Sequence, residues 1–481
     1  MLRSPTALNC PTSPPIHKGG NFKQAKNYRP VALTSHLSKI FEKVVRNAIV
    51  DFIEKHSLMN PNQHGFRKGH SCLSQLLQHQ DTITHLLEQN MNVDVVYLDF
   101  SKAFDKLDIR ITLQKLYNMG VVGKVFHWIE AFLTNRKQCV VVRDAKSEPV
   151  TVMSGVPQGS VIGPLLFLVL LHDIDHEASF SRIASFADDT RILCGIRSTQ
   201  DVSNLQSDLN AVFEWAMWNN ATFNPDKFEL IRYGPDEEIK NSTSYLANNK
   251  AKIDCCQSVR DLGVYMSPDA TFTDHITKTL KSANQKCGWI LRVFKTRDKN
   301  ALITLWKSLV APKLDYCCQL WSPNKPGQIT SIESIQSNFL KKVQGLSGLD
   351  YWEQLRSLNM YSLQRRRERY ICIYIWKILE GHVPNFGIRH YSNERRGRLC
   401  IVPPVQTGAK QRLQTIRHNS MGVYGPRLFN WLPVWIRNMS NCSVDVFKRA
   451  LDRHLVLIPD EPRVPKLVKY CQKGGNSLLD Y

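Results

Sequence analysis

Two adjacent aspartates, Asp188 and Asp189, lie in the middle of a segment that otherwise predicts β-structure. The residues from Ser181 to Ile196 predict a strand, a tight turn and a second strand. Neighbouring carboxylates repel each other, so such a turn is costly unless a cation neutralises it, and hard oxygen ligands of this kind suit Mg²⁺. Aspartate is also a good residue for an ordinary polar turn. The pair by itself favours that simpler explanation.

A third carboxylate, Asp99, lies where an apolar strand is expected to end. The segment Asn92–Phe100 is β-branched and aromatic and predicts a buried strand. An acid at the end of such a strand can face a site without being buried unpaired. Asp94, Asp105 and Asp108 are close in sequence, but only Asp99 has this position. A cap for the following helix explains a single aspartate here more readily than a site does.

The combination of these acids predicts more than each acid alone. Three carboxylates from two chain segments can hold two Mg²⁺ ions that activate a 3′-hydroxyl and stabilise departing pyrophosphate. Between the acids lies SGVPQGSVIGPLLF (154–167), whose glycines and prolines allow a backbone to approach a ligand closely. Its Gln158 can hydrogen-bond a sugar or base without adding charge. The alternative is an ordinary loop that leads into a buried helix.

The periodicity of apolar residues predicts an α+β or α/β unit up to about residue 270 and a mainly helical, basic region beyond Phe272. An irregular lead-in, rich in Pro, Ser and Gly, is expected over residues 1–25. Helices are expected over 37–54, 72–89, 109–133, 163–173 and 200–220, and strands over 92–100, 138–143, 148–153 and on both sides of the turn within 181–196.

The charge balance favours a polyanionic partner. The chain has 63 Lys and Arg against 42 Asp and Glu, a formal net charge of +21, which suits nucleic acid or an anionic membrane surface. Its most apolar stretch, Val161–Leu171, is too short to span a bilayer, and we expect no membrane association. The 13 cysteines include no C-x-x-C pair, which predicts reduced thiols in an intracellular protein, nuclear or cytoplasmic.

The motifs DFSKAFD, SGVPQGSVIGPLLF and FADD, in this order, resemble the palm of reverse transcriptases, in particular those of non-LTR (LINE-like, jockey- and CR1-type) retrotransposons. The resemblance extends through NYRPVALTSHLSKIFEKVV (27–45), HGFRKGHSC (64–72), NPDKFELIRYG (224–234) and VRDLGVYMSPDATFTDHI (259–276). The downstream segments LDYCCQLW (314–321) and FNWLPVWI, near Trp431, also resemble the family, so the resemblance covers nearly the whole chain. It implies a right-hand polymerase fold, with an antiparallel palm sheet, fingers and a helical thumb, followed by a mainly helical basic C-terminal region.

The same resemblance implies domains, activity and partners. We expect fingers and palm over 26–275 after the lead-in (1–25), a thumb-like region over 276–345 and the basic region over 346–481. The implied activity is RNA-directed DNA polymerisation with two Mg²⁺ ions, for which Mn²⁺ can substitute. The implied partners are an RNA template, a DNA primer, their hybrid and deoxynucleoside triphosphates. No endonuclease is expected ahead of the fingers, as in a truncated element. The alternatives are an inactive remnant that only binds nucleic acid and an acid-pair metal nuclease.

The resemblance also assigns the catalytic roles. Asp99 and Asp188 would be the main metal ligands, and Asp189 the supporting acid of the doublet. Lys227 would be the general acid that protonates pyrophosphate, although a lone lysine after Pro225-Asp226 is otherwise unremarkable.

Six residues are implied to bind the incoming nucleotide and template: Phe100, Phe104, Gln158, Gly159, Arg67 and Lys68. The Phe104 ring would clash with a 2′-hydroxyl and so select deoxynucleotides, whereas the alternative is a core phenylalanine. Arg67, with Lys68, would grip the triphosphate, because a planar guanidinium matches phosphate oxygens. The alternative there is a solvated basic loop.

A second basic feature is RRRERYICIYIW (365–376), which interleaves arginines with aromatic residues. Arg365, Arg366, Arg367 and Arg369 are predicted to bind nucleic acid, since arginines beside aromatic rings suit phosphate contact and base stacking. The alternative is an amphipathic helix with a basic solvated face and an aromatic core face. We favour nucleic-acid contact for the arginines and the core for the aromatic residues.

Overall fold

The structure, a computed structural model, describes residues 12–406, 410–462 and 476–481. These residues form two compact units. The first comprises the described residues of Met1–Lys68, Asp94–Leu230 and Asp236–Cys255, and the second those of Gly69–Val93, Ile231–Pro235 and Cys256–Tyr481. The four segments predicted from the sequence (1–25, 26–275, 276–345 and 346–481) stay predictions.

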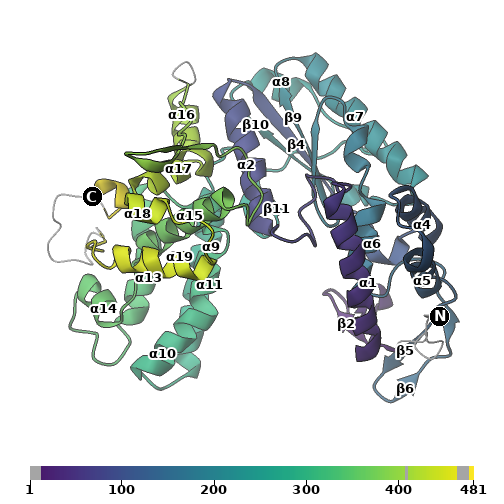
Figure 1. Cartoon of the computed structure of the whole chain (residues 1–481), viewed down its shortest axis with the longest axis horizontal. Helices are drawn as coiled ribbons and strands as arrows, with labels where there is room; N and C mark the ends of the chain where they lie inside the picture. Colours follow the sequence, from purple (N-terminus) through teal and green to yellow (C-terminus); the bar gives the residue numbers. More distant parts are fainter. Residues whose placement is uncertain (1–11, 407–409, 463–475) are drawn as a thin grey trace. The chain divides into compact units, whose positions relative to one another are not determined.

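The central sheet has four strands in the order β10-β4-β9-β8 (Figure 1). Their bounds are β4 Asn92–Leu98, β8 Arg182–Phe186, β9 Asp189–Ile196 and β10 Glu229–Tyr233. The β8 and β9 strands form an antiparallel hairpin in which Phe186 is paired with Asp189, so Ala187 and Asp188 are the whole loop. The side chains of β4 are buried on both faces except for one half-buried position, as its continuous apolar run predicts. The strand–turn–strand predicted around FADD is confirmed.

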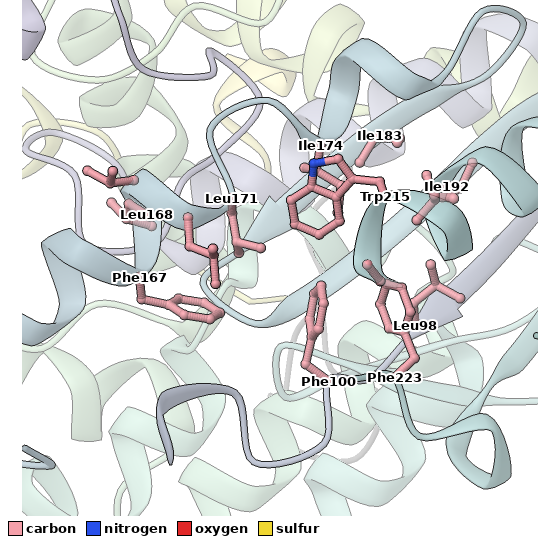
Figure 2. Packing of buried hydrophobic residues seen from close by; sticks show 14 of the residues in the cluster. Leu98, Phe100, Phe167, Leu168, Leu171, Ile174, Ile183, Ile192, Trp215 and Phe223 are labelled. Atoms are coloured by element: carbon pink, nitrogen blue, oxygen red, sulfur yellow. The ribbon is translucent and has the colours of Figure 1, made fainter. Parts of the chain in front are cut away.

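The helices of the first unit close a core against this sheet. The α6 helix (Gly163–Leu170) begins with a proline in its first turn, and α7 (Thr199–Trp218) begins with a capping box made by Ser198 and Asp201. Every apolar residue of α6 from Leu165 on is buried. Figure 2 shows the rings of Phe100 and Phe223 side by side within this core, with centroids 4.3 Å apart.

Most predicted elements are confirmed with small shifts of their ends. The remaining elements up to residue 151 are α1 His36–Lys55, α2 Cys72–Glu88, α3 Ala103–Lys106, α4 Ile109–Asn118, α5 Gly123–Leu133, β5 Lys137–Val142, β6 Ala145–Lys146 and β7 Val150–Thr151. Two predictions were too long. The strand expected over 148–153 is the two-residue β7, and the helix expected over 163–173 ends at Leu170.

The irregular lead-in predicted over residues 1–25 is wrong for its described part. β1 (Thr12–Ser13) pairs in parallel with β5, and β2 (Pro15–His17) pairs antiparallel with β3 (Tyr28–Pro30). Both strands take their hydrogen bonds from distant partners, so local composition does not reveal them. Residues 1–11 lie outside the described residues.

The second unit is mainly helical, as predicted beyond Phe272. Its longest helices after Phe272 are α9 Thr273–Val293, α13 Pro326–Leu340, α15 Leu363–Leu379, α17 Met421–Trp431 and α19 Val444–Leu455. It also contains a hairpin that the sequence did not predict, β13 (His390–Asn393) with β14 (Gly397–Cys400). Among the described residues, no helix combines the length and apolar character that crossing a membrane requires.

The α2 helix belongs to the second unit, although its sequence lies among the predicted fingers and palm. It packs on α12 (Cys318–Trp321), α16 (Gln411–His418) and α17. The Arg417 guanidinium lies 2.6 Å from a carboxylate oxygen of Asp81 and 3.5 Å from one of Glu88. These two ion pairs join segments that are far apart in sequence, which is why periodicity alone could not assign the helix.

Candidate active site

The tight turn between β8 and β9 decides where the two adjacent aspartates lie. Ala187 has a φ of 57°, the left-handed conformation that two-residue hairpin loops need and that residues other than glycine adopt uncommonly. Asp188 is half-buried, whereas Asp189 is exposed as the first residue of β9. Asp188 therefore lies in the loop itself, whereas Asp189 is the first residue of the strand that follows.

Asp99 follows directly after β4, as the sequence predicted. Its backbone carbonyl accepts a hydrogen bond from the Asn224 amide at 2.8 Å, which fixes the end of the strand. Its Oδ2 accepts a hydrogen bond from Nζ of Lys227, also at 2.8 Å, and the side chains of Asp99 and Lys227 are 32% and 61% exposed. Lys227 therefore reaches the carboxylate of Asp99 from the solvent side.

Asp99 and Asp188 line a single cavity of about 950 Å³. Burial raises the pKa of Asp188, the negative charge of Asp99 raises it further, and the positive charges of Arg29 and Lys227 lower it. The two carboxylates thus lie within each other's electric field. A divalent cation between them would relieve that repulsion.

These two carboxylates fit a hard cation such as Mg²⁺ by the chemistry of their oxygen donors. Asp189 is not among the residues that line the cavity. Over the described ranges, no group of three or more His, Cys, Asp or Glu side chains is gathered closely enough to hold an ion. The structure therefore brings together two of the three predicted ligands.

The loop between residues 154 and 160 forms another wall of the cavity, which Gln158 and Gly159 line. The Gln158 Nε2 donates a hydrogen bond to Oδ1 of Asp105, so its amide has a fixed orientation. At Gly155, a Cβ would lie 2.5 Å from the carbonyl oxygen of Asp105, and its φ is +76°. At Gly159, a Cβ would lie 2.9 Å from the carbonyl oxygen of Ala32. Both glycines permit the close approaches that the sequence suggested.

The two predicted phenylalanines differ in what they expose. Phe104 lines the cavity and is half-buried, with its ring centroid 4.8 Å from that of Phe167 and 6.2 Å from that of Phe66. Phe100 also borders the cavity but is only 5% exposed, because its ring stacks on Phe223. Phe104 can therefore present a ring to a ligand, whereas the ring of Phe100 supports the core.

Arg67 and Lys68, the predicted triphosphate contacts, do not line the cavity. The Arg67 guanidinium donates to the carbonyl oxygen of Asn60 at 2.8 Å and lies 3.2 Å from a carboxylate oxygen of Glu54. Its triphosphate contact stays a prediction. In this structure, the Arg67 guanidinium instead holds the preceding loop through the carbonyl oxygen of Asn60.

Sequence reasoning missed three charged residues near this cavity. Lys18 and Arg29 line it. Lys18 lies in the segment that was predicted to be irregular, and Arg29 was assigned no role. Glu42 of α1 is fully buried and accepts hydrogen bonds from the amides of Val161 at 2.6 Å and Ile162 at 3.3 Å. Burial raises the pKa of Glu42. The motif NYRP, which contains Arg29, was the available signal for that residue, whereas no local pattern marks Glu42.

The nucleic-acid contact predicted for Arg365 and Arg367 is wrong, because the two side chains are 0% and 2% exposed. Arg365 donates to the carbonyl oxygen of Pro459 at 3.1 Å. Arg366 lies 2.7 Å from a carboxylate oxygen of Asp315, with two further hydrogen bonds to that carboxylate.

Arg369 has the same arrangement with Asp452, with 2.7 Å between Nη2 and Oδ2. These guanidinium groups are engaged because α15 is surrounded by protein, with buried residues on all of its faces. Nucleic-acid contact by Arg366 and Arg369 stays a prediction that would require their ion pairs to open. The aromatic residues Tyr374 and Trp376 are buried, as predicted.

The sheet carries one carboxylate at a strand end and another at a hairpin turn, and both line one cavity, an arrangement that suits a metal-dependent active site. The family of the chain follows from its sequence. A family model described as "Reverse transcriptase (RNA-dependent DNA polymerase)" matches residues 16–266, and the chain belongs to that family.

Curated relatives agree with this family. The chain is 29% identical over 344 residues to "Probable RNA-directed DNA polymerase from transposon X-element" of Drosophila melanogaster, covering 69% of this chain and 37% of the relative. It is 26% identical over 333 residues to "RNA-directed DNA polymerase from mobile element jockey" of Drosophila funebris, covering 66% and 36%. The chain thus spans little more than a third of the length of these relatives.

Among solved structures, apo telomerase from Candida Tropicalis is similar at a TM-score of 0.43 and 8% identity, over 87% of this chain and 69% of that chain. A global likeness of this size carries no functional argument, so the family rests on sequence.

Proposed function

We propose that this chain is an RNA-directed DNA polymerase of a non-LTR retrotransposon, which adds deoxynucleotides to a DNA 3′-end on an RNA template. One observation carries the proposal: Asp99 and Asp188 come from separate segments of the family-matched span and line the same cavity. In each addition, the primer 3′-oxygen forms a bond to the α-phosphorus, the bond to pyrophosphate breaks, and the hydroxyl proton leaves.

Asp99 and Asp188 would hold the metal, which we propose to be two Mg²⁺ ions with Mn²⁺ as a substitute. Bound metal lowers the pKa of a coordinated hydroxyl and neutralises phosphate charge. Asp189 adds negative charge one residue from Asp188 without lining the cavity. Lys227 donates a hydrogen bond to Asp99, which places its ammonium group beside the carboxylates. It is our candidate for protonating pyrophosphate.

The other walls of the cavity provide groups for the nucleotide. Phe104 presents a half-buried ring where a 2′-hydroxyl would clash, which favours deoxynucleotides. Gln158, held by Asp105, offers a fixed amide to a sugar or base. Lys18 and Arg29 supply positive charge for a triphosphate. Arg67, with Lys68, remains a candidate only if the loop that carries them moves.

The proposed partners are an RNA template, a DNA primer and the hybrid they form. The net charge of +21 supports polyanion binding. Residues 276–345 are our candidate for the thumb that grips this hybrid.

The test is primer extension by purified protein on an RNA template. Asp188→Asn keeps the size of the side chain and removes its charge, so we expect extension to fall about 10³-fold, as when several kcal/mol of transition-state stabilisation is lost. Asp144→Asn, at an exposed turn outside the cavity, is the matched control and should extend normally.

Three outcomes would contradict the proposal. If the wild type extends no primer with Mg²⁺ or Mn²⁺ but binds RNA in a salt-sensitive manner, the chain is an inactive nucleic-acid-binding remnant. If Asp188→Asn extends as well as Asp144→Asn, the cavity is not the catalytic site. Degradation of nucleic acid without added triphosphates would instead identify a nuclease.

A further inference from the structure

The short segment from Asn60 to Arg67 runs alongside the turn that carries Asp188. The His64 amide donates to the carbonyl oxygen of Ser185 at 2.9 Å, and the Ser185 amide donates to the carbonyl oxygen of Asn62 at 3.1 Å. Gln63 and Ser185 thereby form an isolated parallel bridge. The segment acts as an added strand on β8 directly before the turn.

The side chain of Gln63 continues this contact onto the turn itself. Its Oε1 accepts hydrogen bonds from the amides of Ala187 at 2.8 Å and of Gly65 at 2.7 Å. Its Nε2 donates a longer bond, 3.3 Å, to the carbonyl oxygen of Ala187. Gln63 is only 3% exposed. The side-chain amide of Gln63 thus forms hydrogen bonds with both the N–H and the C=O of Ala187. Because Gln63 is buried, water cannot easily replace these two bonds.

Close packing reinforces this clamp. A Cβ on Gly65 would lie 2.3 Å from the amide nitrogen of Ala187, so only glycine allows the two backbones to meet. The next residue, Phe66, places its ring edge-on to Phe104, with centroids 6.2 Å apart. The segment therefore touches both the turn that carries Asp188 and the aromatic wall of the cavity.

We propose that Gln63 is a positioning residue for the metal-binding turn. Ala187 is held in a left-handed conformation that alanine adopts uncommonly, and the Gln63 amide holds the peptide groups on both sides of its Cα. Asp188 follows immediately, so its approach to Asp99 depends on this clamp. The proposal rests on the proposed function for its kinetic consequence, but not for its structural consequence.

The structural test is amide hydrogen exchange, measured by mass spectrometry on peptides that cover residues 186–189 of the full chain. Gln63→Met keeps the length of the side chain and removes both polar atoms. We expect the Ala187 amide to exchange at least about tenfold faster in this variant, since it loses its acceptor. Gln63→Glu retains the acceptor oxygen and should keep most of the protection.

The kinetic test uses the same variants in primer extension. Loss of groups that orient metal ligands lowers metal affinity or activity about 10- to 100-fold. For Gln63→Met we therefore expect kcat to fall in that range and the Mn²⁺ concentration for half-maximal binding to rise, with KM for primer–template unchanged. Mn²⁺ binding is measured directly by electron paramagnetic resonance without nucleotide.

A matched control separates positioning from general destabilisation. Gln354 is also a fully buried amide, which donates to the carbonyl oxygen of Leu346 at 2.9 Å in the second unit. Gln354→Met should lower the melting temperature without changing exchange at Ala187, Mn²⁺ binding or kcat.

The inference is overturned if Ala187 stays protected in Gln63→Met, or if its exchange rises while Mn²⁺ binding and kcat both match the wild type. If Gln63→Met does not fold, Gln63→Glu is used instead, because it loses only the donor to the Ala187 carbonyl oxygen. Weaker Mn²⁺ binding and a lower kcat in Gln63→Glu would then support the inference, and wild-type values of both would overturn it. A different result would separate the two proposals. If Gln63→Met shows faster exchange and weaker Mn²⁺ binding, but the wild type itself extends no primer, the proposed function fails and this inference stands.

Discussion

The cavity of the first unit and the α15 helix of the second unit both concentrate charged side chains, but they use them differently. In the cavity, Asp188 has a raised pKa because it is partly buried beside another acid, and Lys227 binds Asp99 from a largely exposed position. Along α15, Arg366 and Arg369 each lie within hydrogen-bond distance of their own aspartate.

The difference shows which charges are available for function. A charged side chain that is paired inside the protein has no free group for a ligand, and removing one partner of such a pair destabilises the fold. A carboxylate that faces a cavity beside a like charge is destabilised until a cation arrives, and perturbed groups of that kind gather at functional sites. Clusters of charge in a sequence therefore indicate function only where the fold leaves them unneutralised. Three further predictions test this difference between the cavity and α15.

The largest effect is expected where an α15 arginine is removed. Burial raises the pKa of Glu368, and the positive charge of Arg365 counteracts that rise. Arg365→Met should leave the carbonyl oxygens of Ile458 and Pro459 without their donor and remove a positive charge near Glu368, so we expect the free energy of unfolding, measured by urea denaturation, to fall by about 3–5 kcal/mol. The exposed Arg396 of the second unit is the control, and Arg396→Met should have no such effect.

RNA binding at several salt concentrations tests whether Arg365 contacts nucleic acid. When one phosphate contact is lost, the slope of the logarithm of the binding constant against the logarithm of the salt concentration falls by about 1. If Arg365→Met produces that reduction and leaves stability unchanged, the arginine binds nucleic acid and the distinction between the two regions fails.

A smaller effect is expected from His275 in α9. Burial lowers the pKa of His275 from 6.5 to about 4, and its Nδ1 accepts a hydrogen bond from the Tyr265 amide. The unfolded chain therefore binds a proton between pH 6.5 and about 4 that the folded chain does not bind. The resulting stabilisation is complete above pH 6.5 and is lost as the pH falls towards 4, by about 3 kcal/mol.

Urea unfolding at pH 7 and at pH 4.5 measures this loss, and His275→Gln is the comparison. Glutamine can still accept the hydrogen bond but does not titrate, so the variant should lose less stability on acidification. Equal losses in the wild type and the variant would show that His275 is not the responsible group.

The smallest effect is expected at the phenylalanines that border the cavity. Phe104→Ala should relax the discrimination between deoxy- and ribonucleotides by about 10- to 200-fold, since steric exclusion in an apolar pocket is worth about 1–3 kcal/mol. Phe100→Ala should instead lower stability, because its ring is stacked on Phe223 in the core. Single-nucleotide incorporation compares the two variants. If Phe104→Ala keeps its selectivity for deoxynucleotides and Phe100→Ala loses it, then Phe100 and not Phe104 excludes ribonucleotides.

Much of the fold was predictable because its signals are local. The strand β4 ends where an apolar run meets Asp99, and the hairpin of β8 and β9 follows from β-branched residues on both sides of a short polar turn. The loop at Gly155 and Gly159 was recognisable from its glycines, which the structure requires for close backbone contacts. In each case, neighbouring residues contain the information.

The predictions that failed concern partners distant in sequence. The strands β1 and β2 exist because β5 and β3 supply their hydrogen bonds. Arg365 and Arg367 of α15 were expected to contact nucleic acid, but both are buried, and Arg365 donates to a backbone carbonyl oxygen. Such compensation cannot be read from a single segment, because burial depends on what other segments bring to the same place.

The sequence by itself determined the family of this chain, the identity of its acidic residues and the order of its palm motifs. The three-dimensional structure was needed to show that Asp99 and Asp188 line one cavity that Asp189 does not line, and that Gln63 hydrogen-bonds the turn between the strands. The physical reason is that an active site depends on directions and distances between segments. Motif order restricts those distances, but side-chain alternation and backbone hydrogen bonds fix them.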